Sequence, residues 1–138
     1  MDMTNERAGV LAAYRTVAGI DAAPEEFMKM AMDAVRTFLL QAEIGIAAGD
    51  RRTKAAALSA AAKIVEFMLG LSGSDPGALS ERLAHIYRYV LAAILKGNLA
   101  DDAEAVSAAR VAIEQFAAVW RRAFPDAGRL ETALIAAD

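Results

Sequence analysis

Three short breaks that contain glycine and aspartate divide most of this 138-residue chain into four segments of similar length. Between the breaks, apolar residues recur with the period of an α-helix, and 34 alanines favour helix throughout. Helices of similar length joined by short turns run antiparallel to their neighbours. The pattern therefore predicts an all-α fold, an antiparallel up-down-up-down four-helix bundle. The breaks are Gly49-Asp50, residues 72–77 and residues 97–101.

Residues at the breaks suit the ends of these helices. Gly49 is a plausible helix stop because glycine adopts the left-handed backbone at low cost, and Asp50 can cap the next helix. By the same reasoning, we expect Gly97 to end the third helix and Asp101 to cap the fourth. Gly45 is either a site of close packing or a site where the first helix frays. The expected helices cover residues 24–48, 51–71, 76–96 and 102–124.

The helices carry more apolar rows than one small core requires. About three apolar positions in seven suffice for a helix of a bundle, and the first and third helices exceed that fraction. The extra rows predict grooves that receive another segment of this chain, a second copy or a partner helix. The rows are Phe27, Ala31, Ala34 and Phe38; Met28, Met32, Val35 and Leu39; Leu58, Ala61, Val65 and Met68; Ile64, Phe67 and Leu71; Leu79, Leu83, Ile86, Val90 and Ile94; Tyr87, Leu91 and Leu95; and Val106, Ala109, Ile113, Phe116 and Trp120.

Two flanks extend beyond the bundle, which we expect to span residues 24–124. Residues 1–23 have an amphipathic pattern that predicts a short helix or clamp. Residues 125–138 form a C-terminal tail with a few apolar residues.

The composition excludes several classes of chemistry. The chain has no cysteine, which excludes disulfides, thiol nucleophiles and thiolate metal sites, and its single histidine excludes a multi-histidine metal centre. A net charge of −3 argues against a dedicated nucleic-acid binder. No phosphate-binding glycine loop is present. We therefore expect no catalytic residue, no metal and no cofactor.

The charged clusters are interpreted as solvated. Glu81 and His85 form one i, i+4 pair without a second histidine, which is typical of an exposed helix face. Arg51, Arg52 and Lys54 are expected at a solvated helix end rather than at a phosphate site. The chain begins without a signal-peptide pattern, and its longest strongly apolar stretch is far shorter than the roughly 20 residues that span a bilayer. We expect a cytoplasmic protein with no membrane insertion.

Short motifs also follow one another in a fixed order along the chain. They are Ala13-Tyr14-Arg15; residues 22–26; residues 30–34; Phe38-Leu39; Gln41-Ala42; residues 47–50; residues 86–90; Asn98; Asp101-Asp102; Phe116; and Trp120-Arg121-Arg122. Together they resemble the flagellar secretion chaperone family (FliS) over about residues 13–124. Met32 and the run Leu91-Ala92-Ala93 depart from the family's pattern.

The resemblance implies an antiparallel helical bundle with an N-terminal cap segment, and a chaperone without enzymatic activity in the bacterial cytosol. Members of the family bind the disordered C-terminal region of flagellin, prevent its premature polymerisation and deliver it to the flagellar export apparatus. The implied partners are therefore flagellin and components of the export gate. The cap in residues 1–23 would use Val10, Leu11, Tyr14 and Val17.

On this hypothesis, a client binds in grooves along the first and third helices. Methionine suits such grooves because it repacks against varied shapes. We expect Met32→Glu and Tyr89→Glu to leave the fold intact and to weaken flagellin binding. The alternative is a homodimeric helical adaptor, in which self-association through the extra apolar rows forms the dimer interface. The expected client-binding residues are Met28, Met32, Leu39, Tyr87, Tyr89 and Leu91.

Overall fold

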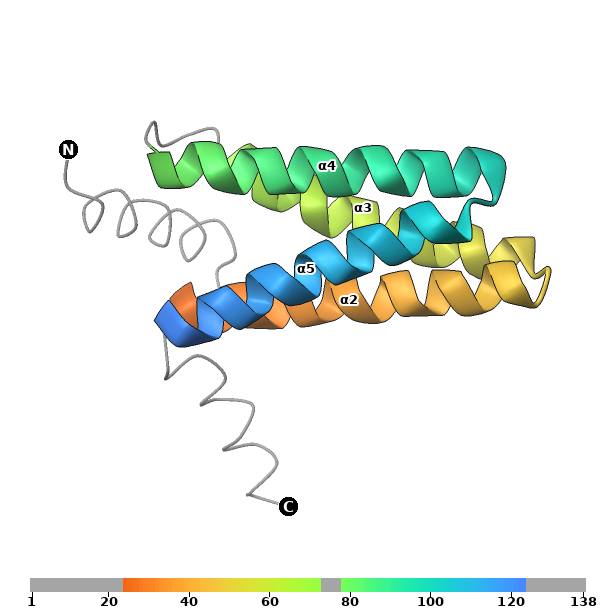
Figure 1. Ribbon diagram of the computed structural model, residues 1–138, viewed down its shortest axis with the longest axis horizontal. Helices are drawn as coiled ribbons and strands as arrows, with labels where there is room; N and C mark the ends of the chain where they lie inside the picture. Colours follow the sequence, from red (N-terminus) through yellow and green to blue (C-terminus); the bar gives the residue numbers. More distant parts are fainter. Residues whose placement is uncertain (1–23, 73–77, 124–138) are drawn as a thin grey trace, which may run out of the picture.

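The computed structural model describes residues 24–72 and 78–123, and four helices lie in these two stretches (Figure 1). No strand occurs among the described residues, so the prediction of an all-α fold is confirmed. The predicted cap in residues 1–23 and the tail in residues 125–138 lie outside the described residues. The helices are α2 (Pro24–Ala47), α3 (Arg51–Ser72), α4 (Ala78–Ala100) and α5 (Ala103–Ala123).

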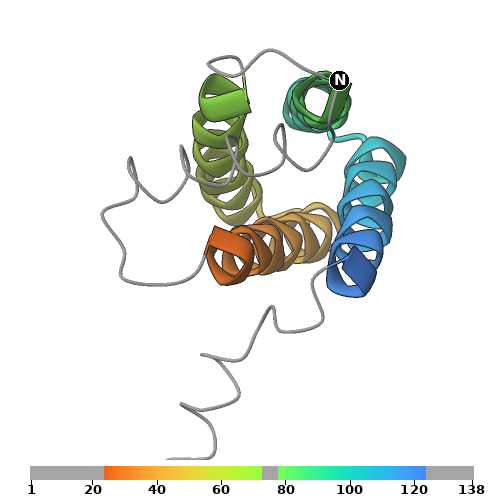
Figure 2. The same cartoon turned by 90° about the vertical axis from the view of Figure 1, so that its left-hand side faces the viewer.

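The four helices surround one core. Both α2 and α4 pack against α3 and α5, and the end-on view places α2 and α4 at opposite corners (Figure 2). The colours in Figure 1 show that consecutive helices run in opposite directions along the long axis. The ion pairs between α2 and α5 also show that these two helices are antiparallel. Arg36 pairs with Glu114, and Glu43, which comes later in α2, pairs with Arg110, which comes earlier in α5.

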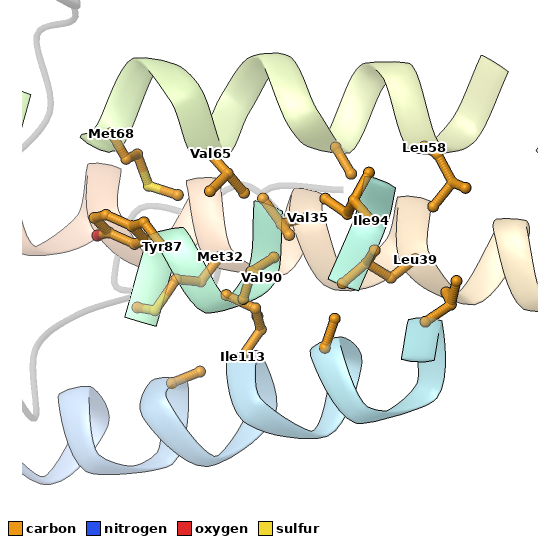
Figure 3. Close-up of a cluster of buried hydrophobic side chains, with 14 of the residues drawn as sticks. Met32, Val35, Leu39, Leu58, Val65, Met68, Tyr87, Val90, Ile94 and Ile113 are labelled. Atoms are coloured by element: carbon orange, nitrogen blue, oxygen red, sulfur yellow. The ribbon is translucent and has the colours of Figure 1, made fainter. Parts of the chain in front are cut away.

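Each helix contributes one buried row to the core (Figure 3). In α5 the predicted row is confirmed at Val106, Ala109, Ile113 and Trp120, whereas Phe116 lies beside the core and is partly buried. Alanines at several core positions allow neighbouring helices to approach closely. The other rows are Met28, Met32, Val35, Leu39 and Ala42 of α2; Ala57, Leu58, Ala61, Val65 and Met68 of α3; and Leu83, Tyr87, Val90 and Ile94 of α4.

The turn between α2 and α3 has the geometry that its residues predict. Gly49 has a φ of 69°, and its N–H donates to the carbonyl oxygen of Ile46 at 3.1 Å. The N–H of Asp50 donates to the carbonyl oxygen of Gly45 at 2.8 Å, which completes a Schellman motif. The Asp50 carboxylate then accepts from the N–H of Thr53 at 3.1 Å and caps α3. Both predictions for this turn, the glycine stop and the aspartate cap, are confirmed.

Gly45 lies at a close approach between α2 and α3. A Cβ at this position would be 2.9 Å from the backbone nitrogen of Lys54 and 3.2 Å from the carbonyl oxygen of Asp50. Both neighbours are backbone atoms, so neither can rotate away from a side chain. Of the two interpretations of Gly45, close packing is therefore the correct one.

The end of α4 differs from the prediction. Gly97 does not end the helix, which continues to Ala100. A Cβ at position 97 would clash with the Val106 side chain, so this glycine allows α4 and α5 to pack closely. The cap of α5 is Asp102 rather than Asp101, because its carboxylate accepts from the N–H of Ala105 at 3.1 Å. Asp101 instead forms the turn, with a φ of 51°.

The expectation that Lys54 lies at a solvated helix end is wrong. Its exposed fraction is only 6%. The Nζ donates to the carbonyl oxygen of Asn98 at 3.0 Å and pairs with the carboxylate of Asp101. Asn98 lies in the last turn of α4 and Asp101 directly follows this helix, and the fold brings both next to the first turn of α3. Arg51 and Arg52, in contrast, are exposed as expected.

We expect Gly45→Ala to lower the free energy of unfolding by about 1–3 kcal/mol, because the added methyl group must displace backbone of α3. Gly70 offers a matched control, since it is an exposed glycine within α3 with no atom near its Cβ position. Gly70→Ala should raise the free energy of unfolding by about 0.5–1 kcal/mol. Urea unfolding measures both, and equal effects of the two substitutions would contradict the close approach.

The Lys54–Asp101 pair also predicts a pH dependence. The hydrogen bond from Lys54 lowers the pKa of Asp101 below its ordinary value of 3.8. A carboxylate with a lowered pKa stabilises the fold above its unfolded-state pKa, and this contribution disappears as the pH falls through the folded-state pKa. Asp101→Asn should therefore be less stable than wild type at pH 7, with the difference shrinking below about pH 4. Urea midpoints of the two proteins at pH 7 and pH 3 measure this, and a constant difference would refute it.

Candidate functional site

The described residues offer little for catalysis or metal binding. Among residues 24–72 and 78–123, no group of three or more acidic or histidine side chains could hold a metal ion. Glu81 and His85 are both exposed on α4. No helix in the same stretches combines the length and apolar character that a bilayer span requires. The candidate functional site is therefore a surface that could bind another chain.

A groove of about 430 Å³ lies between α3 and α4. Its floor is apolar, and Ser59, Glu66 and Asn98 contribute its polar groups. These two helices pack side by side along the upper part of the bundle in Figure 2. An apolar groove between two antiparallel helices fits one face of a third helix. The apolar lining residues are Ala55, Leu58, Ala62, Leu91, Ile94 and Leu95.

Exposed leucines extend the groove along α4. Leu95 is 59% exposed and Leu99 is 77% exposed, although leucine side chains stabilise a fold most when they are buried. Leu91, Leu95 and Leu99 are spaced four residues apart, so they follow one face of the helix. We call the surface formed by the groove and these leucines the α3/α4 surface.

Charge is sparse in the groove itself. Glu66 is the one ionisable side chain among its lining residues. Exposed Lys63 lies one helical turn from Glu66, and exposed Arg88 lies one turn before Leu91. The arrangement suits binding by apolar contact with charged groups at the margin, and it places no acid–base pair for chemistry.

The seam between α2 and α5 provides a contrast. Arg110 donates to the carboxylates of Glu43 and Glu114, and Arg36 lies 3.7 Å from Glu114. The hydrogen bond to Glu43 raises the pKa of the Arg110 guanidinium, so this group stays charged at any pH the protein meets. Ion pairs thus connect α2 to α5, whereas the groove between α3 and α4 is lined mostly by apolar side chains.

Four of the predicted client-binding residues are in the core. Met28, Met32, Leu39 and Tyr87 are each at most 1% exposed, and the Tyr87 hydroxyl donates to the sulfur of Met28 at 3.5 Å. Figure 3 shows Met32, Leu39 and Tyr87 among the buried side chains. In the closed bundle they present no surface to a partner. The physical reason is the rotation of α2 and of α4 about their axes, which directs one row of each helix at the core. In α2 the row of Phe27 lies at the side of the core and is partly buried. This placement corrects the expectation that these four residues line an open groove.

The other two predicted residues are accessible but separate. Leu91 lines the α3/α4 groove, while Tyr89 is 48% exposed. Residues two positions apart on a helix differ in direction by about 200°, so Tyr89 lies on the other flank of α4. The predicted cap residues Val10, Leu11, Tyr14 and Val17 lie outside the described residues, and their role stays a prediction.

Sequence reasoning missed Leu95 and Leu99 as site residues. The available signal was the number of large apolar residues on α4, which exceeds what one core-facing row can use. The partners of Leu95 on α3, including Leu58 and Ala62, could not be identified without the packing of the two helices.

Comparison with known proteins assigns this chain to a family. The family model described as "Flagellar protein FliS" matches residues 8–127. The flagellar secretion chaperone FliS of Salmonella typhimurium is 28% identical over 117 residues, which cover 83% of this chain and 87% of that protein. The flagellar secretion chaperone FliS of Escherichia coli is 24% identical over 106 residues, which cover 75% of this chain and 78% of that protein.

Because Met32 is buried, Met32→Glu should destabilise the fold, whereas the sequence alone predicts that this substitution leaves the fold intact. Met32→Glu places a carboxylate in the core without a partner, so we expect it to lower the free energy of unfolding by about 3 kcal/mol or more. Tyr89→Glu is the matched comparison on the surface and should change stability by less than about 1 kcal/mol. Thermal unfolding followed by circular dichroism measures both. A Met32→Glu variant as stable as wild type would show that this position is not buried.

Proposed function

Because this chain belongs to the family of the flagellar protein FliS, we propose that it is a flagellar secretion chaperone whose client is the C-terminal region of flagellin. The observation that carries the proposal is the α3/α4 surface, where an apolar groove and two highly exposed leucines lie together. A groove of this kind binds a peptide segment by apolar contact and needs no catalytic group.

In this proposal the client segment is disordered when free and becomes helical on the α3/α4 surface. Its apolar residues at i, i+3, i+4 and i+7 would contact Leu91, Leu95 and the floor of the groove. Ordering a disordered chain costs conformational entropy, so a useful affinity requires a long contact surface. The exposed row that continues to Leu99 supplies additional apolar area for this contact.

In this proposal, binding of the client's C-terminal region has two consequences, which are prevention of premature polymerisation and delivery of the subunit for export. A flagellin segment held on this protein cannot pair with other flagellin subunits, which prevents premature polymerisation in the bacterial cytosol. The complex then delivers the subunit to the flagellar export apparatus, with components of the export gate as further partners. The N-terminal cap, through Val10, Leu11, Tyr14 and Val17, would close over the bundle and be displaced when the client binds.

Leu95→Ser and Leu99→Ser test the proposal. Each substitution removes apolar area from the α3/α4 surface, and we expect each to weaken binding of a C-terminal flagellin fragment by roughly tenfold, or about 1.4 kcal/mol. Both side chains are more than half exposed, so the fold should remain intact. Val111→Ser on α5 is the matched control, since Val111 is also exposed but lies on another helix. Isothermal titration calorimetry measures all three.

The outcome distinguishes the chaperone from the homodimeric adaptor. Light scattering should show a monomer that forms a one-to-one complex with the flagellin fragment. A stable dimer that does not bind the fragment, and that Leu95→Ser or Leu99→Ser converts to a monomer, would assign the same surface to self-association instead.

A further inference from the structure

The side chain of Lys54 connects the start of α3 to the end of α4 and to the α4–α5 connection, at one end of the bundle. It extends from the first turn of α3 to the carbonyl oxygen of Asn98 and the carboxylate of Asp101. Asn98 belongs to the last turn of α4, and Asp101 lies in the connection to α5. The backbone of the same lysine packs against Gly45 of α2. A single residue therefore sets the distance between the start of α3 and the end of α4.

The last turns of α4 have few apolar contacts to hold them. After Ile94, the one buried residue of this helix is Gly97, which has no side chain. Leu95, Lys96, Asn98, Leu99 and Ala100 are all exposed. The hydrophobic core thus anchors α4 as far as Ile94, and the bonds from Lys54 act on the part of the helix that the core does not reach.

The hydrogen bond to Asn98 also satisfies a group that the helix leaves unpaired. The last four carbonyl groups of an α-helix have no intrahelical donor, and that of Asn98 is one of them because α4 ends at Ala100. The ammonium of Lys54 supplies this donor and places a positive charge at the negative end of the helix dipole. An apolar residue of similar length would fill the space without binding the carbonyl group.

One of the two residues bonded to Lys54, Asn98, belongs to the α3/α4 surface. Asn98 lines the groove, and Leu95, one turn earlier, lines it too. Building on the proposed chaperone function, we propose that Lys54 is a positioning residue. It fixes the C-terminal turns of α4 against α3, and thereby holds the groove in the shape that accepts the client, without contacting the client itself.

Lys54→Met tests this inference, because methionine has a similar length but donates no hydrogen bond. Lys96→Met is the matched control, since Lys96 lies on the same turns of α4, is 68% exposed and makes only a 3.6 Å ion pair with Asp102. Asp101→Asn is a second variant that keeps Lys54 and weakens the pair. Asparagine tolerates the left-handed backbone of position 101, and the side chain there is about half exposed, so this variant should fold.

Two measurements are made on each full-length variant. Amide hydrogen exchange of the free protein should be at least tenfold faster at residues 97–101 in Lys54→Met, with residues 28–42 of α2 unchanged. Calorimetry with the C-terminal flagellin fragment should show binding weakened about tenfold in Lys54→Met and severalfold in Asp101→Asn. Lys96→Met should match wild type in both measurements.

Arg110→Met separates a general loss of stability from the loss of positioning. It removes the ion pair of Arg110 with Glu43 of α2 and the pair with Glu114 within α5. This variant should lower thermal stability but leave exchange at residues 97–101 and fragment binding within twofold of wild type. Unchanged exchange at residues 97–101 in Lys54→Met overturns the inference, and so does wild-type affinity of that variant. If wild type itself fails to bind the fragment, the proposed function is overturned, while the exchange data still decide whether Lys54 positions α4.

Discussion

A buried ammonium group has to be paired, and in this protein that constraint acts at Lys54. Its side chain is removed from water at the point where the start of α3 meets the end of α4. The pairing requires α4 to continue past Gly97 until the Asn98 carbonyl and the Asp101 carboxylate both reach the ammonium. The left-handed residue at 101 and the cap at Asp102 then start α5 in the opposite direction. The pairing of this charge and the close contacts of Gly45 and Gly97 lie together at this end of the bundle.

The same end of the bundle explains several of the motifs that resemble the FliS family. Gly49 and Asp50 form the turn and cap between α2 and α3, while Asn98 and Asp101 bind Lys54. These motifs therefore build the scaffold at this end of the bundle, and Asn98 in addition lines the groove between α3 and α4. Apart from Asn98, the α3/α4 surface uses different residues, mainly leucines and alanines.

Two turns illustrate how far local patterns extend. The turn at Gly49 is predictable because a Schellman motif and an aspartate cap involve only neighbouring residues. The same reasoning gives the wrong result at Gly97, because a glycine can either end a helix or allow close contact with another helix. At Gly97 the contact with Val106 of the next helix is the reason for the glycine, and this contact cannot be recognised from neighbouring residues. The candidate site has the same limit. The sequence predicts Leu91 as a client-binding residue, and this residue does line the groove. Four other predicted client-binding residues are buried in the core, and the sequence pattern does not identify the exposed Leu95 and Leu99 as site residues.

The amino-acid sequence by itself determined where the helices lie, which residues form apolar rows, and that cysteine-based and multi-histidine chemistry is excluded. These properties follow from local propensity and the helical period. Only the tertiary structure decided which row faces inward, because the rotation of a helix about its axis depends on both neighbours at once. It also decided the partner of Lys54, which lies 44 residues away along the chain. The groove is a property of two helices together, so neither helix could reveal it alone.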